Sequence, residues 1–229
     1  RSFVRGFPAG KERDGLFEAA WRAFFGEGRG MNAQETLFTP DEVADLKLWS
    51  ANILAPLRGE AQGYAKALTF AQASALHKLG LKPGPIIESG LVGVSQIEIA
   101  ANETWSPSDH GPYYLTIAVN EAEAVTDIVA FAPDKPNEWF LRRGSAWALG
   151  MDHINGALAW PDTIVSLSAT PLDWLRADMW GACVLDWTTD AIDTIRALQE
   201  IEVSSPKFAA ALRLQLSKPP RLPEIAVSG

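Results

Sequence analysis

Residues 163–185 read TIVSLSATPLDWLRADMWGACVL, and this stretch decides the fold class. Residues 163–167 form a short apolar run, which predicts a buried strand. Thr170 and Pro171 then match a helix start, because threonine caps helices and proline suits the first helical position. Residues 182–185 form a second short apolar run. We therefore expect a strand, a helix and a second strand in succession.

The same alternation continues toward the C-terminus. Thr188 or Thr189 is placed to cap a helix, and residues 201–203 form a third short strand candidate. Ser205 with Pro206 opens a last helix. Strands that alternate with helices favour parallel pairing, so this part predicts a small, partly parallel sheet.

The centre of the chain has a different pattern. Residues 91–99, 113–119 and 125–131 are apolar or alternating runs, separated by acidic or glycine- and proline-containing connections. Such runs are typical of strands joined by turns, and they predict an antiparallel meander. The Pro-Gly-Pro sequence at 83–85 marks a boundary in front of it.

The first third is helical in pattern. Thr39 to Glu42 matches a capping box with proline at the first helical position, and a second helix spans about 61–79 and stops at Gly80. The predicted fold is therefore α+β, a mixed α/β class. It combines N-terminal helices, a central antiparallel meander and a C-terminal strand-helix alternation that forms a small, partly parallel sheet.

The first 30 residues stand apart from the rest. They hold one amphipathic helix candidate with a stripe of Phe17, Trp21, Phe24 and Phe25, followed by a glycine-rich break and then Met31. Our hypothesis is that residues 1–30 are an appendage that is not native, and the alternative is that Met31 is internal. Residues 31–229 then form a single globular domain, with a helical part at 31–82 and a mixed part at 86–229.

Composition limits the class of protein. Of the 229 residues, 47% are hydrophobic and 21% are charged, which is typical of globular proteins. No apolar run reaches the roughly 20 residues of a membrane helix, and no secretory signal is present. The single cysteine, Cys183, lies in an apolar run and predicts a buried structural thiol in a reducing, cytoplasmic compartment. The formal net charge of −8 disfavours direct binding to nucleic acid or anionic lipid.

Strong catalytic and nucleotide-binding motifs are absent from the sequence. The weak candidates begin with Asp109 and His110, because an aspartate can orient an imidazole for acid–base chemistry. Asp109, Gly111 and Pro112 are also what a turn requires, so a plain turn is the alternative. Asp152 and His153 pose the same choice between a catalytic pair and a turn or helix cap.

Acidic residues follow the predicted strand at 182–185. Asp186, with Asp190 and Asp193 after it, stands where α/β sheets place Mg²⁺ and ligand sites. Acids at the start of a helix equally compensate the helix dipole. No ligand spacing supports a bound transition metal, and we expect neither a metal nor a cofactor.

Tryptophan is unusually abundant, with nine residues, most of them in the second half. Trp139, Arg142 and Arg143 combine aromatic bulk with charge, which is typical of protein interfaces. An edge strand that covers a core is the alternative. We expect Trp147 to lie in the core and Trp139 to be half exposed.

Two segments resemble known proteins. Residues 163–198 resemble a degenerate Toprim-like unit, with the helix Pro171-Leu172-Asp173-Trp174-Leu175 between two strands. The family's metal chemistry uses a glutamate after its first strand and an Asp-x-Asp pattern after a later one. Here Ser168-Ala169 and Asp186-Trp187-Thr188 stand in those places, so the resemblance implies lost catalysis. Residues 125–131, with Trp139 and Arg142-Arg143-Gly144, are similar to uncharacterised proteins of α-proteobacterial prophages and plasmids, which implies a mobile-element context.

Three functions follow from these patterns. The first is a non-catalytic accessory protein of a prophage or plasmid that works through contacts with another protein. The alternatives are a metal-assisted hydrolase or nuclease-like enzyme that uses Asp109, His110, Asp152, His153 or Asp186, and a nucleic-acid-associated Toprim-like protein that has lost catalysis. The sequence makes no prediction of the oligomeric state.

Overall fold

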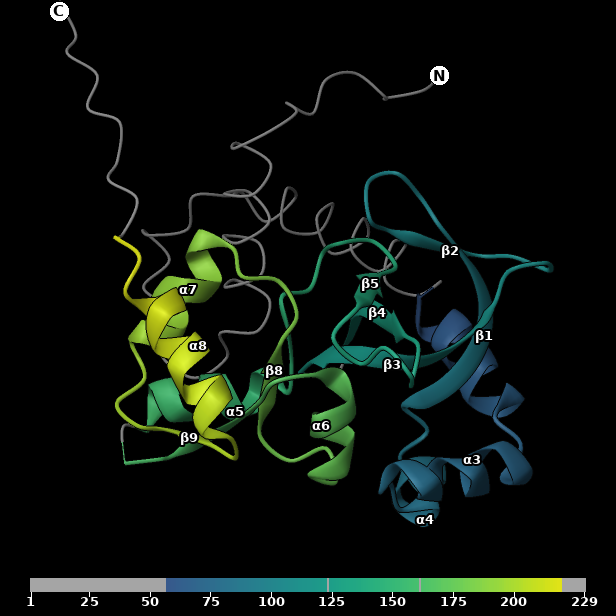
Figure 1. Ribbon diagram of the computed structural model, residues 1–229, viewed down its shortest axis with the longest axis horizontal. Coiled ribbons are helices and arrows are strands. Elements are labelled where there is room, and N and C mark those ends of the chain that lie inside the picture. The colour runs from purple at the N-terminus through teal and green to yellow at the C-terminus, as the bar shows by residue number, and fades with distance from the viewer. Residues whose placement is uncertain (1–56, 123, 161, 220–229) are drawn as a thin grey trace, which may run out of the picture. The chain divides into compact units, whose positions relative to one another are not determined.

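The computed structural model describes residues 57–122, 124–160 and 162–219, all within one compact unit. The predictions on the helix at 17–25, on Met31 and on the helix start at Thr39 lie outside the described residues. The described part is α+β with two sheets, as the sequence predicts (Figure 1). A membrane-crossing helix is absent from it, since no helix there combines the needed length with sufficient apolar character.

The larger sheet has five antiparallel strands in the order β2-β1-β3-β4-β5. The strands are β1 (Val92–Ile99), β2 (Trp105–Pro107), β3 (Tyr113–Glu121), β4 (Ala124–Phe131) and β5 (Trp139–Leu141). The predicted meander is confirmed as β1, β3 and β4, which lie side by side. The two edge strands, β2 and β5, were not predicted, because three residues carry no readable period.

The chain crosses β1 between β2 and β3, since these two strands flank β1. The N–H of Ser108 donates to the carbonyl of Gln96 (3.0 Å), and the N–H of Ile97 donates to the carbonyl of Pro112 (3.1 Å). Gly111 is needed at this crossing, because a Cβ there would lie 1.9 Å from the carbonyl oxygen of Ile97. Residues 108–112 therefore form a tight crossover against the end of β1.

Both faces of this sheet are covered. The helix at 57–67 packs on one face, where Leu57 and Ala61 contact a cluster of Ile97, Trp105, Ala118, Val125, Ile128 and Ala130. Its backbone comes so close that a Cβ on Gly93 would lie 2.3 Å from the carbonyl carbon of Tyr64. The opposite face shares a larger core with the helices that follow and with the second sheet.

The predicted helix at 61–79 is wrong in one respect, because the chain breaks it. The first helix ends at residue 67, and Thr69 begins α3 (Phe70–Leu76) with a capping box to Gln72. A short 3₁₀ turn, η1 (His77–Leu79), follows and ends at Gly80 with a φ of 80°, as expected for a glycine stop. The side chain of Thr69 caps α3, so the chain starts a new helix at this point.

The predicted boundary at 83–85 is also corrected, since these residues begin a helix, α4 (Pro83–Ser89). Proline at the first position of a helix lacks only an N–H that would have no helical partner. The helix ends at Gly90, whose φ is 62°.

The second sheet has four strands in the order β6-β8-β7-β9. They are β6 (Ala148–Leu149), β7 (Val165–Ser168), β8 (Ala182–Val184) and β9 (Ile201–Val203). β7 pairs in parallel with β8 and β9, and β6 pairs antiparallel with β8, so the partly parallel sheet is confirmed. The antiparallel strand β6, of two residues, was not predicted.

The helices of this half are α5 (Met151–Ala159), α6 (Pro171–Arg176), α7 (Thr189–Arg196) and α8 (Pro206–Leu216). The predicted caps are confirmed for three of them. The hydroxyls of Thr170, Thr188 and Ser205 accept the N–H groups of the residues three positions on. The predicted structural thiol is also confirmed, since Cys183 is fully buried and burial raises the pKa of its thiol.

The two sheets share one core and a connecting loop. Val119, Val129 and Phe131 of the first sheet pack in one cluster with Cys183 and Leu185 of the second. The loop at 142–147 joins β5 to β6, and the buried carboxylate of Asp127 on β4 holds it. That carboxylate accepts hydrogen bonds from the N–H groups of residues 143, 145 and 146.

Candidate functional site

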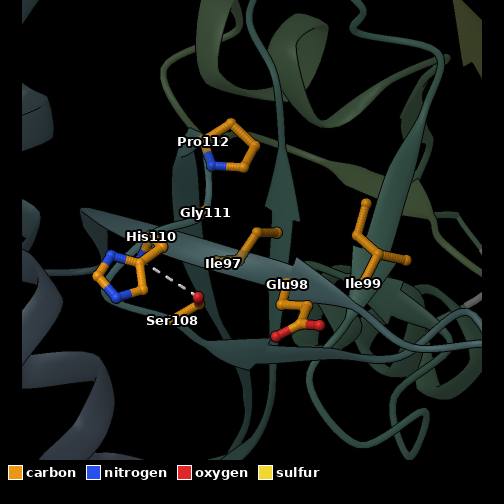
Figure 2. A pocket seen from close by; sticks show the side chains of 7 residues that line it. All are labelled: Ile97, Glu98, Ile99, Ser108, His110, Gly111 and Pro112. Carbon is orange, nitrogen blue, oxygen red and sulfur yellow. Dashed lines mark hydrogen bonds between the residues drawn. The ribbon is translucent and has the colours of Figure 1, made fainter.

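A groove of about 450 Å³ opens at the crossover, and it contains the first sequence candidate, His110. Its lining comes from the end of β1 and the loop between β2 and β3, namely Ile97, Glu98, Ile99, Ser108, His110, Gly111 and Pro112 (Figure 2). Ile99 is 40% exposed, whereas Ile97 is 1% exposed and packs in the buried cluster on one face of the sheet. Most of its lining is apolar.

The polar groups of the groove do not form a catalytic arrangement. The Oγ of Ser108 accepts the backbone N–H of His110 (3.3 Å), a bond typical of a turn that a serine begins. Figure 2 shows Ile97 and Ile99 on one side of β1 and Glu98 on the other, while the imidazole of His110 points away from the Glu98 carboxylate. Asp109 is exposed in the same turn. These contacts favour the turn interpretation of Asp109 and His110.

Asp152 and His153 lie in the first turn of α5, after Gly150, which has a φ of 70°. The Oδ1 of Asp152 accepts the N–H of Ala122 (3.3 Å), so this side chain links α5 to the turn that follows β3. The imidazole of His153 packs edge-on against the indole of Trp180, with 4.5 Å between ring centroids. Both side chains therefore support packing.

Asp186 follows β8 and is exposed. Of the other acids after this strand, Asp190 lies in the first turn of α7, and Asp193 pairs with Arg196 at 2.7 Å. Across residues 57–219, apart from 123 and 161, no three His, Cys, Asp or Glu side chains are placed to hold a metal ion. The five candidates therefore lie in three separate places: Asp109 and His110 in the crossover loop, Asp152 and His153 in α5, and Asp186 after β8. Only candidates adjacent in sequence lie together.

The interface candidates at 139–143 are partly engaged inside the fold. Trp139 is half buried, as expected, and its indole N–H donates to the carbonyl of Leu185, directly after β8 of the second sheet (2.9 Å). Arg142 donates from Nε to Glu60 (2.8 Å), whereas the Arg143 side chain is exposed. Trp147 is half buried against the core of the second sheet.

A partly buried network around Arg142 was not expected from the sequence. The hydroxyl of Tyr64 donates to Oε1 of Glu60 (2.6 Å), the same atom that accepts from Arg142. The guanidinium lies 5.5 Å from the ring centre of Trp105 and donates to its carbonyl. Burial and the bond to Glu60 raise the pKa of Tyr64. This network fastens the helix at 57–67 to the sheet.

The seven tryptophans within residues 57–219 divide into three groups. Trp105 and Trp174 are buried. Trp187 is half buried, like Trp139 and Trp147. Trp160 and Trp180, in contrast, are 74% and 67% exposed. An aromatic core accounts for the first two groups. Of the two exposed indoles, Trp180 contacts the imidazole of His153 and Trp160 has no ring contact among the described residues, and both leave most of their surface in water.

Comparison with known proteins identifies no relative for this arrangement. No protein-family model, no curated protein and no solved structure matches the chain.

Proposed function

We propose that this chain is a non-catalytic protein that acts by binding another protein. The observation that carries the proposal is the exposure of Trp160 and Trp180. An exposed indole leaves a large apolar area in water, and tryptophan is the residue most enriched among energetically dominant interface positions.

The surroundings of Trp160 add to this support. Leu158 and Ile164 are 40% and 52% exposed, and the N–H of Thr163 donates to the carbonyl of Trp160 at 2.9 Å. Neighbouring exposed apolar side chains favour a contact surface over a chance exposure.

The candidate acids and histidines favour binding over catalysis. A metal-assisted hydrolase needs several of these groups around one reacting atom. Here Asp152 and His153 make contacts that support the fold, and His110 lies in a turn. We therefore place the hydrolase hypothesis second.

The resemblance to prophage and plasmid proteins suggests the accessory role in a mobile element, in the cytoplasm. The parallel pair of β7 and β8 around α6 is compatible with the Toprim-like likeness. The segment lacks the acids that the family's chemistry requires, so this likeness favours a unit without catalysis. The net charge of −8 continues to disfavour nucleic acid as the direct partner.

Affinity capture with point variants tests the proposal. We expect one protein to co-purify in stoichiometric amount with the wild type and to be lost with Trp160→Ser or Trp180→Ser. Leu214→Ser is the matched control, because Leu214 is 72% exposed on α8, and capture should be unchanged. Circular dichroism confirms that each variant is folded. Capture that is equal in all variants, or no stoichiometric protein, would contradict the proposal.

A further inference from the structure

The charge of the chain is unevenly distributed. Between Lys82 and Lys135 there is no lysine or arginine, whereas eight acids occur there, namely Glu88, Glu98, Glu103, Asp109, Glu121, Glu123, Asp127 and Asp134. The rest of the chain holds 20 acidic and 20 basic residues. The whole formal net charge of −8 therefore comes from the segment that forms α4 and the first four strands.

Several of these acids face solvent around the antiparallel sheet. The exposed ones are Glu88, Glu98, Glu103, Asp109 and Asp134. Glu98 lines the groove at the crossover, and Asp109 stands between two of its lining residues. Within the described residues, neither carboxylate forms an ion pair. We call Glu98 and the exposed Asp109 beside the lining the negative rim of the groove.

The groove also offers apolar surface. Ile99, which is 40% exposed, and Pro112 line it, and Tyr113, which follows directly at the start of β3, is 66% exposed. An apolar side chain that enters such a groove is removed from water, while a neighbouring cation interacts with the rim. The same rim repels phosphate groups and acidic segments.

We propose that this groove binds an extended segment of a partner protein in which an apolar side chain stands next to lysine or arginine. The inference rests on the proposed function and names the chemistry of one partner surface. The apolar lining supplies burial for the anchor, and Glu98 and Asp109 select the charge beside it. Gly111 and the bonds of the crossover hold the lining in place before the partner arrives.

The test uses the full chain, labelled with ¹⁵N, and a synthetic probe peptide of sequence Gly-Lys-Val-Lys-Leu-Lys-Val-Gly. Two further peptides separate the contributions, one with glutamate for each lysine and one with serine for each valine and leucine. We expect amide shifts at residues 97–99, 108–111 and 113 with the first peptide only. Raising NaCl from about 50 to 500 mM should weaken this binding, because exposed charges are screened.

Charge variants decide whether the rim acts locally. Glu98→Lys with Asp109→Lys should weaken the dissociation constant at least tenfold. Glu200→Lys with Glu202→Lys changes the overall charge equally at exposed sites beside and on β9, and it should change the constant less than twofold. If the first pair fails to fold, Glu98→Gln with Asp109→Asn gives a milder test in the same direction. Ile99→Ser should also weaken binding, because it removes apolar surface that covers the anchor side chain.

Several results would overturn the inference. Equal weakening by both lysine pairs would show attraction to overall charge, and shifts away from the groove would place the contact elsewhere. If the serine peptide bound equally well, the apolar side chains would contribute nothing and the anchor part of the inference would be wrong. Groove shifts that depend on protein concentration without peptide would make a second copy of the chain the occupant. If protein capture still depends on Trp160 and Trp180 while the groove fails these tests, only this inference falls and the proposed function stands.

Discussion

Asp127→Asn is the most informative change to the fold, because it keeps the shape while it replaces one accepting oxygen by a donor and removes the charge. Asp127 is fully buried. One carboxylate oxygen accepts the N–H of Ile128 (2.8 Å) and that of Arg143 (3.0 Å). The other accepts the N–H and the hydroxyl of Ser145 (2.7 and 3.1 Å) and the N–H of Ala146 (3.3 Å).

Asparagine can offer an oxygen to only one of these two groups, so in either orientation its NH₂ faces two backbone N–H donors. Each buried donor left without an acceptor costs about 1–3 kcal/mol. We therefore expect the free energy of unfolding to fall by about 3 kcal/mol. Urea denaturation followed by circular dichroism measures this loss.

Ser145→Ala is the control for Asp127→Asn. It removes the hydroxyl and leaves the N–H of residue 145 paired, so it should cost only about 1 kcal/mol. A loss below about 1 kcal/mol for Asp127→Asn, or equal losses for the two variants, would refute the view that the carboxylate holds the loop.

Three further predictions concern the first sheet. In a double-mutant cycle of Arg142→Ala and Glu60→Gln, urea melts should give a coupling energy of about 1 kcal/mol, because the side chains are only 27% and 21% exposed; additive losses would mean that the pair adds nothing. Gly111→Ala should destabilise the protein by more than about 2 kcal/mol, since the new Cβ meets the β1 backbone, whereas Gly63→Ala, with open space around it in a helix, should be neutral or stabilising. The pKa of Tyr64 is raised in the folded state above its ordinary value of about 10. Its stabilising contribution is therefore full below that pH and is lost as the pH rises through the folded value. Melts across alkaline pH should show this loss in the wild type and not in Tyr64→Phe.

The elements that the sequence predicts well are those with local signals. Three helix starts are set by residues close in sequence. The hydroxyl at each cap accepts an N–H from the residue three positions on, as in Thr170, Thr188 and Ser205. β5 is different, because its three residues gain strand structure only by pairing with 129–131 on β4. The helix break at Thr69 also has a local signal in the sequence, the Thr-x-x-Gln capping box, which the prediction of one continuous helix overlooked.

The site divides in the same way. The turn at Asp109 and His110 follows from its residue types, and the structure contains it. The groove beside that turn cannot be predicted from residue types, because it forms only where the chain passes from one edge of β1 to the other. Glu60 and Arg142 are equally beyond local reasoning, since 82 positions separate them.

The core that the two sheets share has a consequence for folding. Neither sheet can bury its inner face alone, because Val129 and Phe131 need Leu185 and its neighbours as cover. A partly folded chain with one sheet formed would expose this surface and would lose the bond from Trp139 to Leu185. We therefore expect the two sheets to unfold together as one cooperative unit. In hydrogen exchange, we expect the amides of β4 and β8 to open together.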